Sequence, residues 1–213
     1  MHPHGQNLSD EIYTLLKSKI LRGEYKGGEK IPEEYLAKEF GVSRTPIREA
    51  VRRLGEYGLV DIKPRCYAVV SSISEKEAAD IARVRIDLEC LAIDLITQKN
   101  LEANLKDLAR HAAECQYAAD IDDRAGIFIQ DSLFHLSLVK ASDNITLYNV
   151  YERLEIKIQQ LRVNQNLYSL DLKDYIKQHG TIMSLLKEGK KQDCKNLMYE
   201  HIIHETRPED LRL

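Results

Sequence analysis

The regular spacing of apolar residues constrains the fold of this chain more than any other feature. From residue 75 to residue 203, apolar side chains recur every three or four positions, the interval that gives an α-helix one buried face. Short polar breaks separate the stretches, so the pattern predicts an all-α bundle of six or seven helices. The helical stretches are residues 79–96, 101–119, 127–139, 145–161, 170–186 and 194–203.

The first seventy residues combine helical spacing with one short β pattern. Helices are expected over residues 10–21, over residues 31–40 and again after Ser43. Two β-branched runs, 58–62 and 67–70, flank Lys-Pro-Arg-Cys and predict a hairpin with a basic tip, a wing. We therefore expect a mainly α chain. Residues 1–72 would form a winged helix-turn-helix domain, and residues 73–213 would form the helical domain, with Ser74 placed to cap its first helix.

Residues 41–54 carry the strongest functional signal. A helix there places Arg44, Arg48 and Arg52 on one face, because they are four residues apart. Two short helices joined by a glycine-containing turn, the second basic, form the helix-turn-helix arrangement. Guanidinium groups pair with guanine edges and phosphates, so the pattern favours DNA, and a solvated basic face is the alternative. The face suited to burial carries Ile47, Val51 and Leu54.

The charge balance permits DNA binding although the whole chain has a net charge of −3. Residues 1–70 hold 12 Lys and Arg against 10 Asp and Glu, whereas the remainder holds 19 against 24. Binding to an operator needs local neutralisation of phosphates rather than a basic chain. The acidic excess therefore lies outside the part that we expect to contact DNA.

The cysteines and the hydropathy pattern indicate the cellular compartment in which the protein is expected. The 4 cysteines form no Cys-x-x-Cys pair, so we expect reduced thiols in the cytoplasm. No apolar run approaches the eighteen or so residues that a membrane span needs, and no signal peptide is evident. We expect a cytoplasmic protein without a membrane partner.

Four residues of the helical domain have the chemistry of a metal site. Asp131 and His135 are one turn apart on one helix, while His179 and His201 fall in later helices. One carboxylate and three imidazoles suit Zn, Ni, Mn or Fe with positions left open for a ligand. Taken singly, each histidine is read as an ordinary polar or buried core residue. His204, one turn after His201, is a rival for the last ligand.

Residues 9–70 hold a set of residues at fixed spacing: Gly28, Ile31-Pro32, Leu36-Ala37, residues 41–51, Leu54 and Gly58-Leu59-Val60. In this set the chain resembles the winged helix-turn-helix of the GntR family of bacterial transcription regulators. The resemblance implies that Arg44 and Arg48 read bases, that Ser43 and Thr45 contact phosphates or bases, and that Arg65 contacts DNA from the wing. The chain departs from the family at Glu34, where many members carry Arg, and at Cys66, where the wing tip usually has Gly.

A second set of residues spans the helical domain: residues 85–89, 131–135 and 141–144, His179, Ile182, Gly189 and His201. Here the chain resembles the FCD domain, the ligand-sensing domain of the FadR-like branch of that family. The resemblance implies a divalent metal bound by Asp131, His135, His179 and His201, with Zn as the first expectation and Ni, Mn or Fe as others. It also implies a small carboxylate effector on or near the metal.

The resemblance suggests residues for the effector and a mode of action. Arg85, or Arg83, would pair with an effector carboxylate, and Asn144 would also contribute. A pair between Arg85 and Glu89 on the same helix is the alternative. We expect an effector-responsive regulator, not an enzyme, that binds double-stranded operator DNA as a homodimer. The helix over residues 145–161 is a candidate dimer interface.

Two other functions compete with this expectation. In a metal-sensing regulator, the metal itself would be the signal and no organic effector would be needed. In a metal-dependent hydrolase, three His and one Asp would activate water. Against the hydrolase, no acidic residue is visibly placed as a general base beside the four residues, and the DNA-binding domain would be unexplained.

Overall fold

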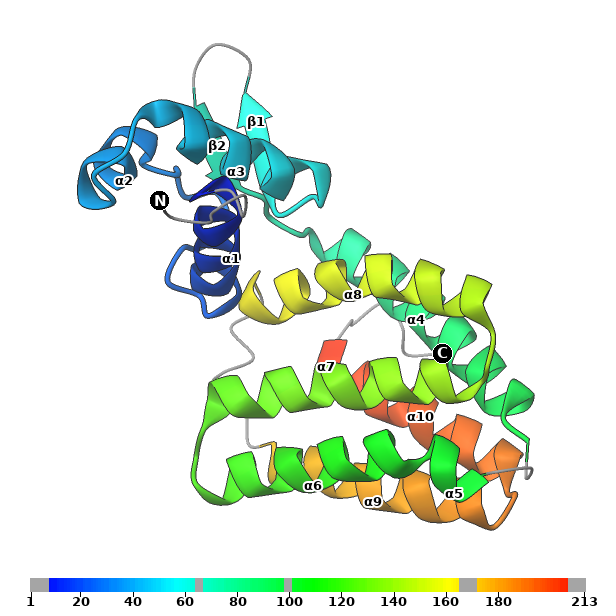
Figure 1. Cartoon of the computed structure of the whole chain (residues 1–213). Helices are drawn as coiled ribbons and strands as arrows, with labels where there is room; N and C mark the ends of the chain where they lie inside the picture. Colours follow the sequence, from blue (N-terminus) through cyan, green and yellow to red (C-terminus); the bar gives the residue numbers. More distant parts are fainter. Residues whose placement is uncertain (1–7, 64–66, 98–100, 165–171, 207–213) are drawn as a thin grey trace, which may run out of the picture. The chain divides into compact units, whose positions relative to one another are not determined.

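The computed structural model describes residues 8–63, 67–97, 101–164 and 172–206 (Figure 1). The chain divides into two compact units. The first comprises residues 1–73 with 160–166, and the second comprises residues 74–159 with 167–213.

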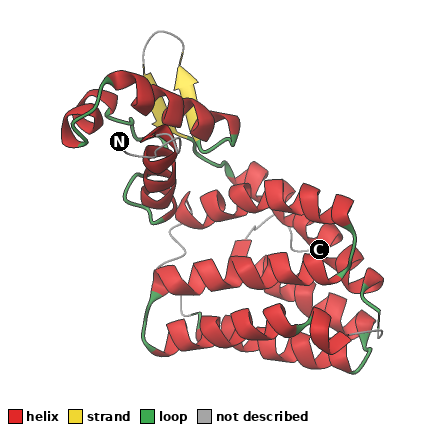
Figure 2. Cartoon of the chain, viewed as in Figure 1, coloured by secondary structure: helices red, strands yellow, loops and turns green. Residues whose placement is uncertain are grey.

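The first unit contains a winged helix-turn-helix. Its elements are α1 (Leu8–Leu21), α2 (Glu33–Glu39), α3 (Arg44–Glu56), β1 (Val60–Lys63) and β2 (Tyr67–Val70). The two strands pair antiparallel, with Val60 opposite Val70 and Lys63 opposite Tyr67, and form the yellow hairpin of Figure 2. The predicted wing is confirmed in these strands. Its tip, with Arg65 and Cys66, lies outside the described residues.

A glycine sets the angle between α2 and α3. Gly41 has φ +64, in the left-handed region that residues with a Cβ rarely adopt. This conformation lets the Val42 amide donate to the Ala37 carbonyl at 3.0 Å, which closes the end of α2. The chain then turns directly into α3. The positive φ of Gly41 explains on steric grounds why a glycine occupies the predicted turn.

Helix α3 is fixed on one face and exposed on the other. Its buried residues are Ile47, Ala50, Val51 and Leu54, the apolar row that the sequence predicts together with one alanine. Arg53 pairs with Asp10 of α1, and its guanidinium lies 4.3 Å from the centre of the Tyr13 ring. Arg53 therefore connects α3 to α1 and leaves the other arginines of α3 to face solvent.

The second unit is a helical bundle, as the apolar spacing predicts. Helix α6 packs against α7 and α9, α4 packs against α7 and α10, and α9 packs against α10. Ser74 caps α4, because its hydroxyl accepts a hydrogen bond from the Glu77 amide at 3.2 Å. The helices are α4 (Glu75–Leu95), α5 (Leu101–Asn104), α6 (Lys106–Asp120), α7 (Arg124–Ala141), α8 (Ile145–Asn164), of which residues 145–159 belong to this unit, α9 (Lys173–Lys187) and α10 (Lys191–Thr206).

The observed helices differ from the expected stretches in one internal break and in several end residues. The stretch 101–119 is broken at Leu105, whose φ of −91 and ψ of 0 interrupt the helix between α5 and α6. The break keeps Leu101, Leu105 and Leu108 buried together, so the apolar spacing gave no sign of it. The helix expected from residue 170 begins at Lys173, and residues 170–171 lie outside the described residues.

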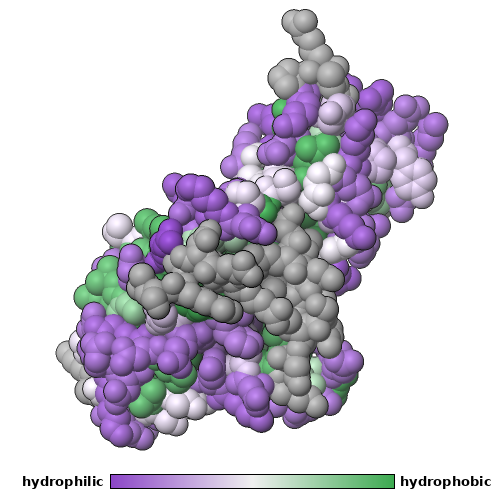
Figure 3. All heavy atoms as spheres, turned by 180° about the vertical axis from the view of Figure 1, so that it is seen from behind, coloured by the Kyte–Doolittle hydropathy of each residue, from purple (hydrophilic) through white to green (hydrophobic). Residues whose placement is uncertain are grey.

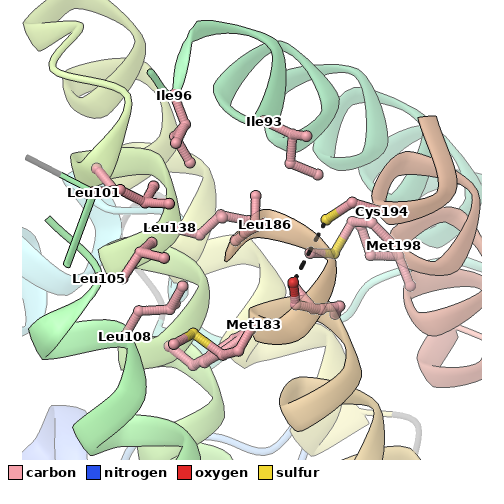
Figure 4. Packing of buried hydrophobic residues seen from close by; sticks show 14 of the residues in the cluster. Ile93, Ile96, Leu101, Leu105, Leu108, Leu138, Met183, Leu186, Cys194 and Met198 are labelled. Atoms are coloured by element: carbon pink, nitrogen blue, oxygen red, sulfur yellow. Dashed lines mark hydrogen bonds between the residues drawn. The ribbon is translucent and has the colours of Figure 1, made fainter. Parts of the chain in front are cut away.

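The main core of the second unit lies between α4, α6, α7, α9 and α10. Figure 4 shows Leu105, Leu138 and Leu186 pointing toward one another, with Met183 and Met198 beside them. Cys194 belongs to this core, and burial raises the pKa of its thiol to about 12. Among the described residues, Cys90, Cys115 and Cys194 are free thiols. No helix in the described part of the chain is both long and apolar enough to cross a membrane.

Candidate functional site

Four polar side chains from three helices meet inside the second unit. Asp131 and His135 stand one turn apart on α7, His179 comes from α9 and His201 comes from α10. Each is at most 1% exposed. One ligand atom from each residue lies within 4.8 Å of the others. The structure thus brings together the four residues singled out in the sequence. We call this buried cluster, with the space between its ligand atoms, the chamber.

The distances in the chamber match those of a metal site. Oδ1 of Asp131 lies 3.0 Å from Nε2 of His179, 3.6 Å from Nε2 of His135 and 3.9 Å from Nε2 of His201. The Nε2 atoms of His135 and His201 are 3.1 Å apart. Two ligands at about 2.1 Å from a tetrahedral cation are about 3.4 Å apart, so the donor atoms stand at the required separations.

Neighbouring side chains fix the orientation of two imidazoles. Nδ1 of His135 donates to Glu89 Oε2 at 2.7 Å, and Nδ1 of His201 donates to Gln178 Oε1 at 2.8 Å. With Nδ1 used as the donor, Nε2 of each ring faces the chamber and can offer its lone pair. Tyr175 donates to Oδ1 of Asp131 at 3.0 Å. Outer groups of this kind are typical of metal-binding histidines.

Glu89 links three helices through one carboxylate. Besides His135 on α7, it accepts hydrogen bonds from Nε of Arg85 on α4 at 2.8 Å and from the hydroxyl of Tyr151 on α8 at 2.7 Å. Burial raises the pKa of Glu89, but His135 and Arg85 outweigh it and lower this pKa to about 2. Glu89 is therefore a permanent anion behind the chamber. The sequence analysis considered it only as a partner of Arg85.

The histidines differ in protonation. Burial lowers the pKa of His179, and burial with the neighbouring imidazoles lowers the pKa of His201 well below its ordinary value. Both are neutral near pH 7, which is the form that binds metals. Burial also lowers the pKa of His135, but the carboxylates of Glu89 and Asp131 outweigh it and raise this pKa to about 9.

His179 gives a further sign that the chamber fits a cation. Its ring stacks on Phe134 with the ring centres 4.0 Å apart. Neither ring nitrogen makes a well-aligned hydrogen bond to a described residue, although Nε2 lies close to Asp131. Buried polar groups without hydrogen bonds are rare because desolvation is costly. Coordination to a cation would satisfy this imidazole.

The other residues expected near the chamber have different surroundings. His204 is exposed on α10 and does not belong to the cluster of four. Arg85 is 1% exposed and pairs with Glu89, and Arg83 pairs with Asp80 at 3.4 Å. Asn144 caps α8, since its Oδ1 accepts from the Leu147 amide at 3.0 Å. The alternative pair between Arg85 and Glu89 thus forms within α4, and Asn144 serves as the N-cap of α8.

The arginines of α3 form the basic side of a groove in the first unit. The side chains of Arg44, Arg48 and Arg52 are 53%, 64% and 68% exposed. Glu33 of α2 lies 3.2 Å from Nε of Arg48 and 4.0 Å from a terminal nitrogen of Arg44. A groove of about 910 Å³ runs along these residues and reaches Lys63 of the hairpin.

The start of α3 is open to solvent. Ser43 holds the N-cap position with φ −69 and ψ 164, but its side chain accepts no hydrogen bond from the helix. Ser43 is therefore an N-cap by backbone conformation alone. Ser43 and Thr45 are exposed beside the first amides of α3, where a helix attracts phosphate.

Comparison with known families decides the identity. Residues 8–70 match the family described as bacterial regulatory proteins, gntR family, and residues 80–204 match the FCD domain. The chain belongs to the GntR family. It is therefore a DNA-binding transcription regulator with an FCD domain rather than an enzyme.

Relatives of this GntR-family chain match it over most of its length. The uncharacterized HTH-type transcriptional regulator YdhC of Bacillus subtilis is 32% identical over 92% of this chain and 88% of its own. The HTH-type transcriptional regulator McbR of Escherichia coli is 24% identical over 91% and 89%. The gluconate operon transcriptional repressor of Bacillus subtilis is 29% identical over 66% of this chain and 57% of its own.

Solved structures share the fold of this GntR-family chain. Escherichia coli McbR/YncC superposes with a TM-score of 0.76 at 22% identity, covering 94% of this chain and 96% of that one. A GntR transcriptional regulator from Rhodococcus sp. RHA1 superposes with a TM-score of 0.78 at 17% identity, covering 96% and 99%. At these identities the likeness concerns the fold alone.

Proposed function

We propose that this regulator holds a divalent cation in the chamber and that a small carboxylate binding at the cation modulates its affinity for operator DNA. Asp131, His135, His179 and His201 would hold the cation, with Zn as the first candidate. The observation that supports this most strongly is that one ring nitrogen from each of three buried imidazoles and one oxygen of a buried carboxylate lie within 4.8 Å of one another. When bound, the cation supplies a positive centre with positions open to an anionic ligand.

The charges around the chamber favour an anionic effector. Asp131 and Glu89 contribute two negative charges, Arg85 contributes one positive charge, and a divalent cation would leave an excess of one positive charge. These side chains are at most 1% exposed, so water does little to screen that excess. A monoanionic carboxylate would balance it. Arg85 and Asn144 remain our candidates for contacts with the rest of the effector.

In the first unit, we propose that α3 enters the major groove. Arg44 and Arg48 would read base edges, Ser43 and Thr45 would contact the backbone, and Arg65 would contact DNA from the wing. One short helix reads few bases, so two copies bound to neighbouring half-sites would supply specificity. The regulator would act as a homodimer on chromosomal DNA in the cytoplasm.

The experiment that tests the metal compares His179 of α9 and His201 of α10 with His204, which lies one turn after His201. The variants His179→Ala and His201→Ala should lose most of the metal found by elemental analysis of the purified protein, while His204→Ala should keep it. All three should retain helical circular dichroism. Equal metal content in the wild type and His201→Ala would contradict the proposed ligand set.

The experiment that tests the effector uses DNA selected from a random pool by the protein itself. Gluconate, citrate and succinate are titrated into the complex, and operator affinity is followed by fluorescence anisotropy. We expect one carboxylate to shift the affinity of the wild type and to leave His179→Ala unchanged. A response to added metal alone, with no carboxylate effect, would select the metal-sensing regulator instead.

A further inference from the structure

Helix α4 carries a row of apolar side chains on the face that points away from its own bundle. Val84, Leu91 and Leu95 are 48%, 45% and 37% exposed, and Leu88 between them is half-buried. At about 100° per residue, these four positions lie within about 60° of one another. Single exposed leucines are ordinary, but a contiguous row marks an interaction surface. Figure 3 shows apolar side chains at the surface of the helical unit.

The row is additional to a complete inner face. Ala82, Ala92 and Ile93 of α4 are fully buried in the core of the second unit. Helix α4 is thus apolar on two sides, which is typical of a helix packed between two bodies. Helix α8 offers no such row among its described residues. Its exposed apolar residues Ile145 and Val150 are five positions apart and lie about 140° apart around the helix.

We propose that the α4 face (Val84, Leu88, Leu91 and Leu95) is the surface on which a second copy of this chain docks, with its own α4 antiparallel. The spacing of the row, four, three and four residues, is the same read in either direction. An antiparallel copy therefore places Val84 against Leu95 of the partner subunit and Leu88 against Leu91 of the partner subunit. A two-fold interface needs a self-complementary patch of this kind. The inference rests on the proposed dimeric function and names its interface.

Charged side chains beside the α4 face also fit a second copy of the same surface. Asp80, Asp87 and Asp94 are seven residues apart and line one flank of the α4 face. Asp80 pairs with Lys76 at 2.7 Å. Asp87, in contrast, is exposed and makes no ion pair or hydrogen bond with any described residue. A row of three carboxylates would repel its own copy unless cations stand opposite.

Helix α10 supplies those cations. Lys195 pairs with the Asp94 carboxylate at 3.0 Å, and Lys191 donates to the Asp94 backbone carbonyl at 2.7 Å. Two lysines and one aspartate leave this end of the flank with one excess positive charge. In an antiparallel pair the same flank of each helix meets the other, and positions 87 and 94 lie opposite. Asp87 of each copy would thus face the lysines of the other, twice by symmetry.

The first experiment measures mass by sedimentation velocity with the full chain as purified. We expect the wild type at twice the 24.5 kDa mass of the chain and Leu91→Asp at the mass of one chain, with unchanged circular dichroism. The matched control Ile145→Asp, at a residue 70% exposed on α8, should stay dimeric. A monomeric wild type, or a dimer that Ile145→Asp dissociates and Leu91→Asp does not, would overturn the proposal.

The second experiment tests the antiparallel pairing by charge exchange. Asp87→Lys and Lys195→Glu should each weaken the homodimer about tenfold. In either variant homodimer, residues 87 and 195 of opposite subunits carry like charges, and symmetry repeats this repulsive pair twice. Mixed together, they should form a heterodimer in which both pairs attract, detected by native mass spectrometry. A mixture that stays at the weakened affinity would refute the antiparallel arrangement. Metal content is measured on every variant. A dimer without metal would contradict the proposed cation and leave this interface standing.

Discussion

Glu89 has three hydrogen-bond partners beside the chamber. It orients His135, neutralises the buried Arg85 and accepts the hydroxyl of Tyr151. Each of these partners lies on a different helix, so the carboxylate holds α4, α7 and α8 together at one point. We infer that the geometry of the chamber depends on this residue although it offers no ligand atom to the cation.

The variant Glu89→Gln isolates that role. The amide keeps the size of the side chain and loses its charge. We expect metal affinity to fall about 10- to 100-fold, as is typical when an outer partner of a ligand histidine is removed. Competition with a chelator measures this, and Glu152→Gln, at an exposed position of α8, is the control. Unchanged affinity would show that His135 needs no carboxylate to hold its orientation.

From the raised pKa of His135 we predict that metal binding releases a proton. Its pKa of about 9 means that Nε2 carries a proton near pH 7, and a cation must displace it. Apparent metal affinity should therefore rise about tenfold per pH unit from pH 7 and level off above pH 9. Calorimetry in two buffers of different ionisation enthalpy should give about one proton released at pH 7. Heats that do not depend on the buffer would contradict this.

Among the elements, α3 combines a fixed side with an exposed one. Its apolar face and Arg53 hold it against the first unit, while Arg44 and Arg48 point into the groove and share Glu33. Because Glu33 lies beside both guanidinium groups, DNA must compete with this carboxylate for them. The net gain on binding is smaller than the guanidinium contacts alone would give.

The variant Arg48→Ala should weaken operator binding by about 1–3 kcal/mol and relax base choice at one position of each half-site. Arg110→Ala removes an arginine of α6 whose side chain is 56% exposed, against 64% for Arg48, and is the matched control. Both are measured by fluorescence anisotropy at one fixed salt concentration. Equal losses for the two variants would mean that Arg48 contributes only general charge.

Helix formation was predictable from the sequence, but the assignment of helix faces was only partly so. The buried row of α3 was identified because its polar side is strongly charged. In α4, apolar residues occupy both the core face and the α4 face, so spacing alone could not tell which of them is buried. The break at Leu105 was missed because it preserves the interval between buried leucines.

At the scale of the molecule, pairings between distant segments were beyond the sequence. Glu89 and His135 are 46 residues apart, and nothing in their spacing indicates that they meet. The four chamber residues were found by their chemistry and by resemblance to a family, since helical periodicity joins only Asp131 and His135. The outer partners Gln178 and Tyr175 gave no comparable signal, because amides and phenols are common on helices.

The ligand atoms of the chamber determine how the regulator would respond to the redox state of the cell. Its donors are one carboxylate oxygen and three imidazole nitrogens, whereas Cys115 and Cys194 lie in the apolar cores of the unit. Soft monovalent copper and cadmium prefer sulfur, and oxidants act on thiolates. Because Zn, the first candidate, has no redox chemistry, a site of nitrogen and oxygen ligands would keep it when thiols are oxidised. Such a regulator would report the supply of its ligand rather than the state of the cell's thiols.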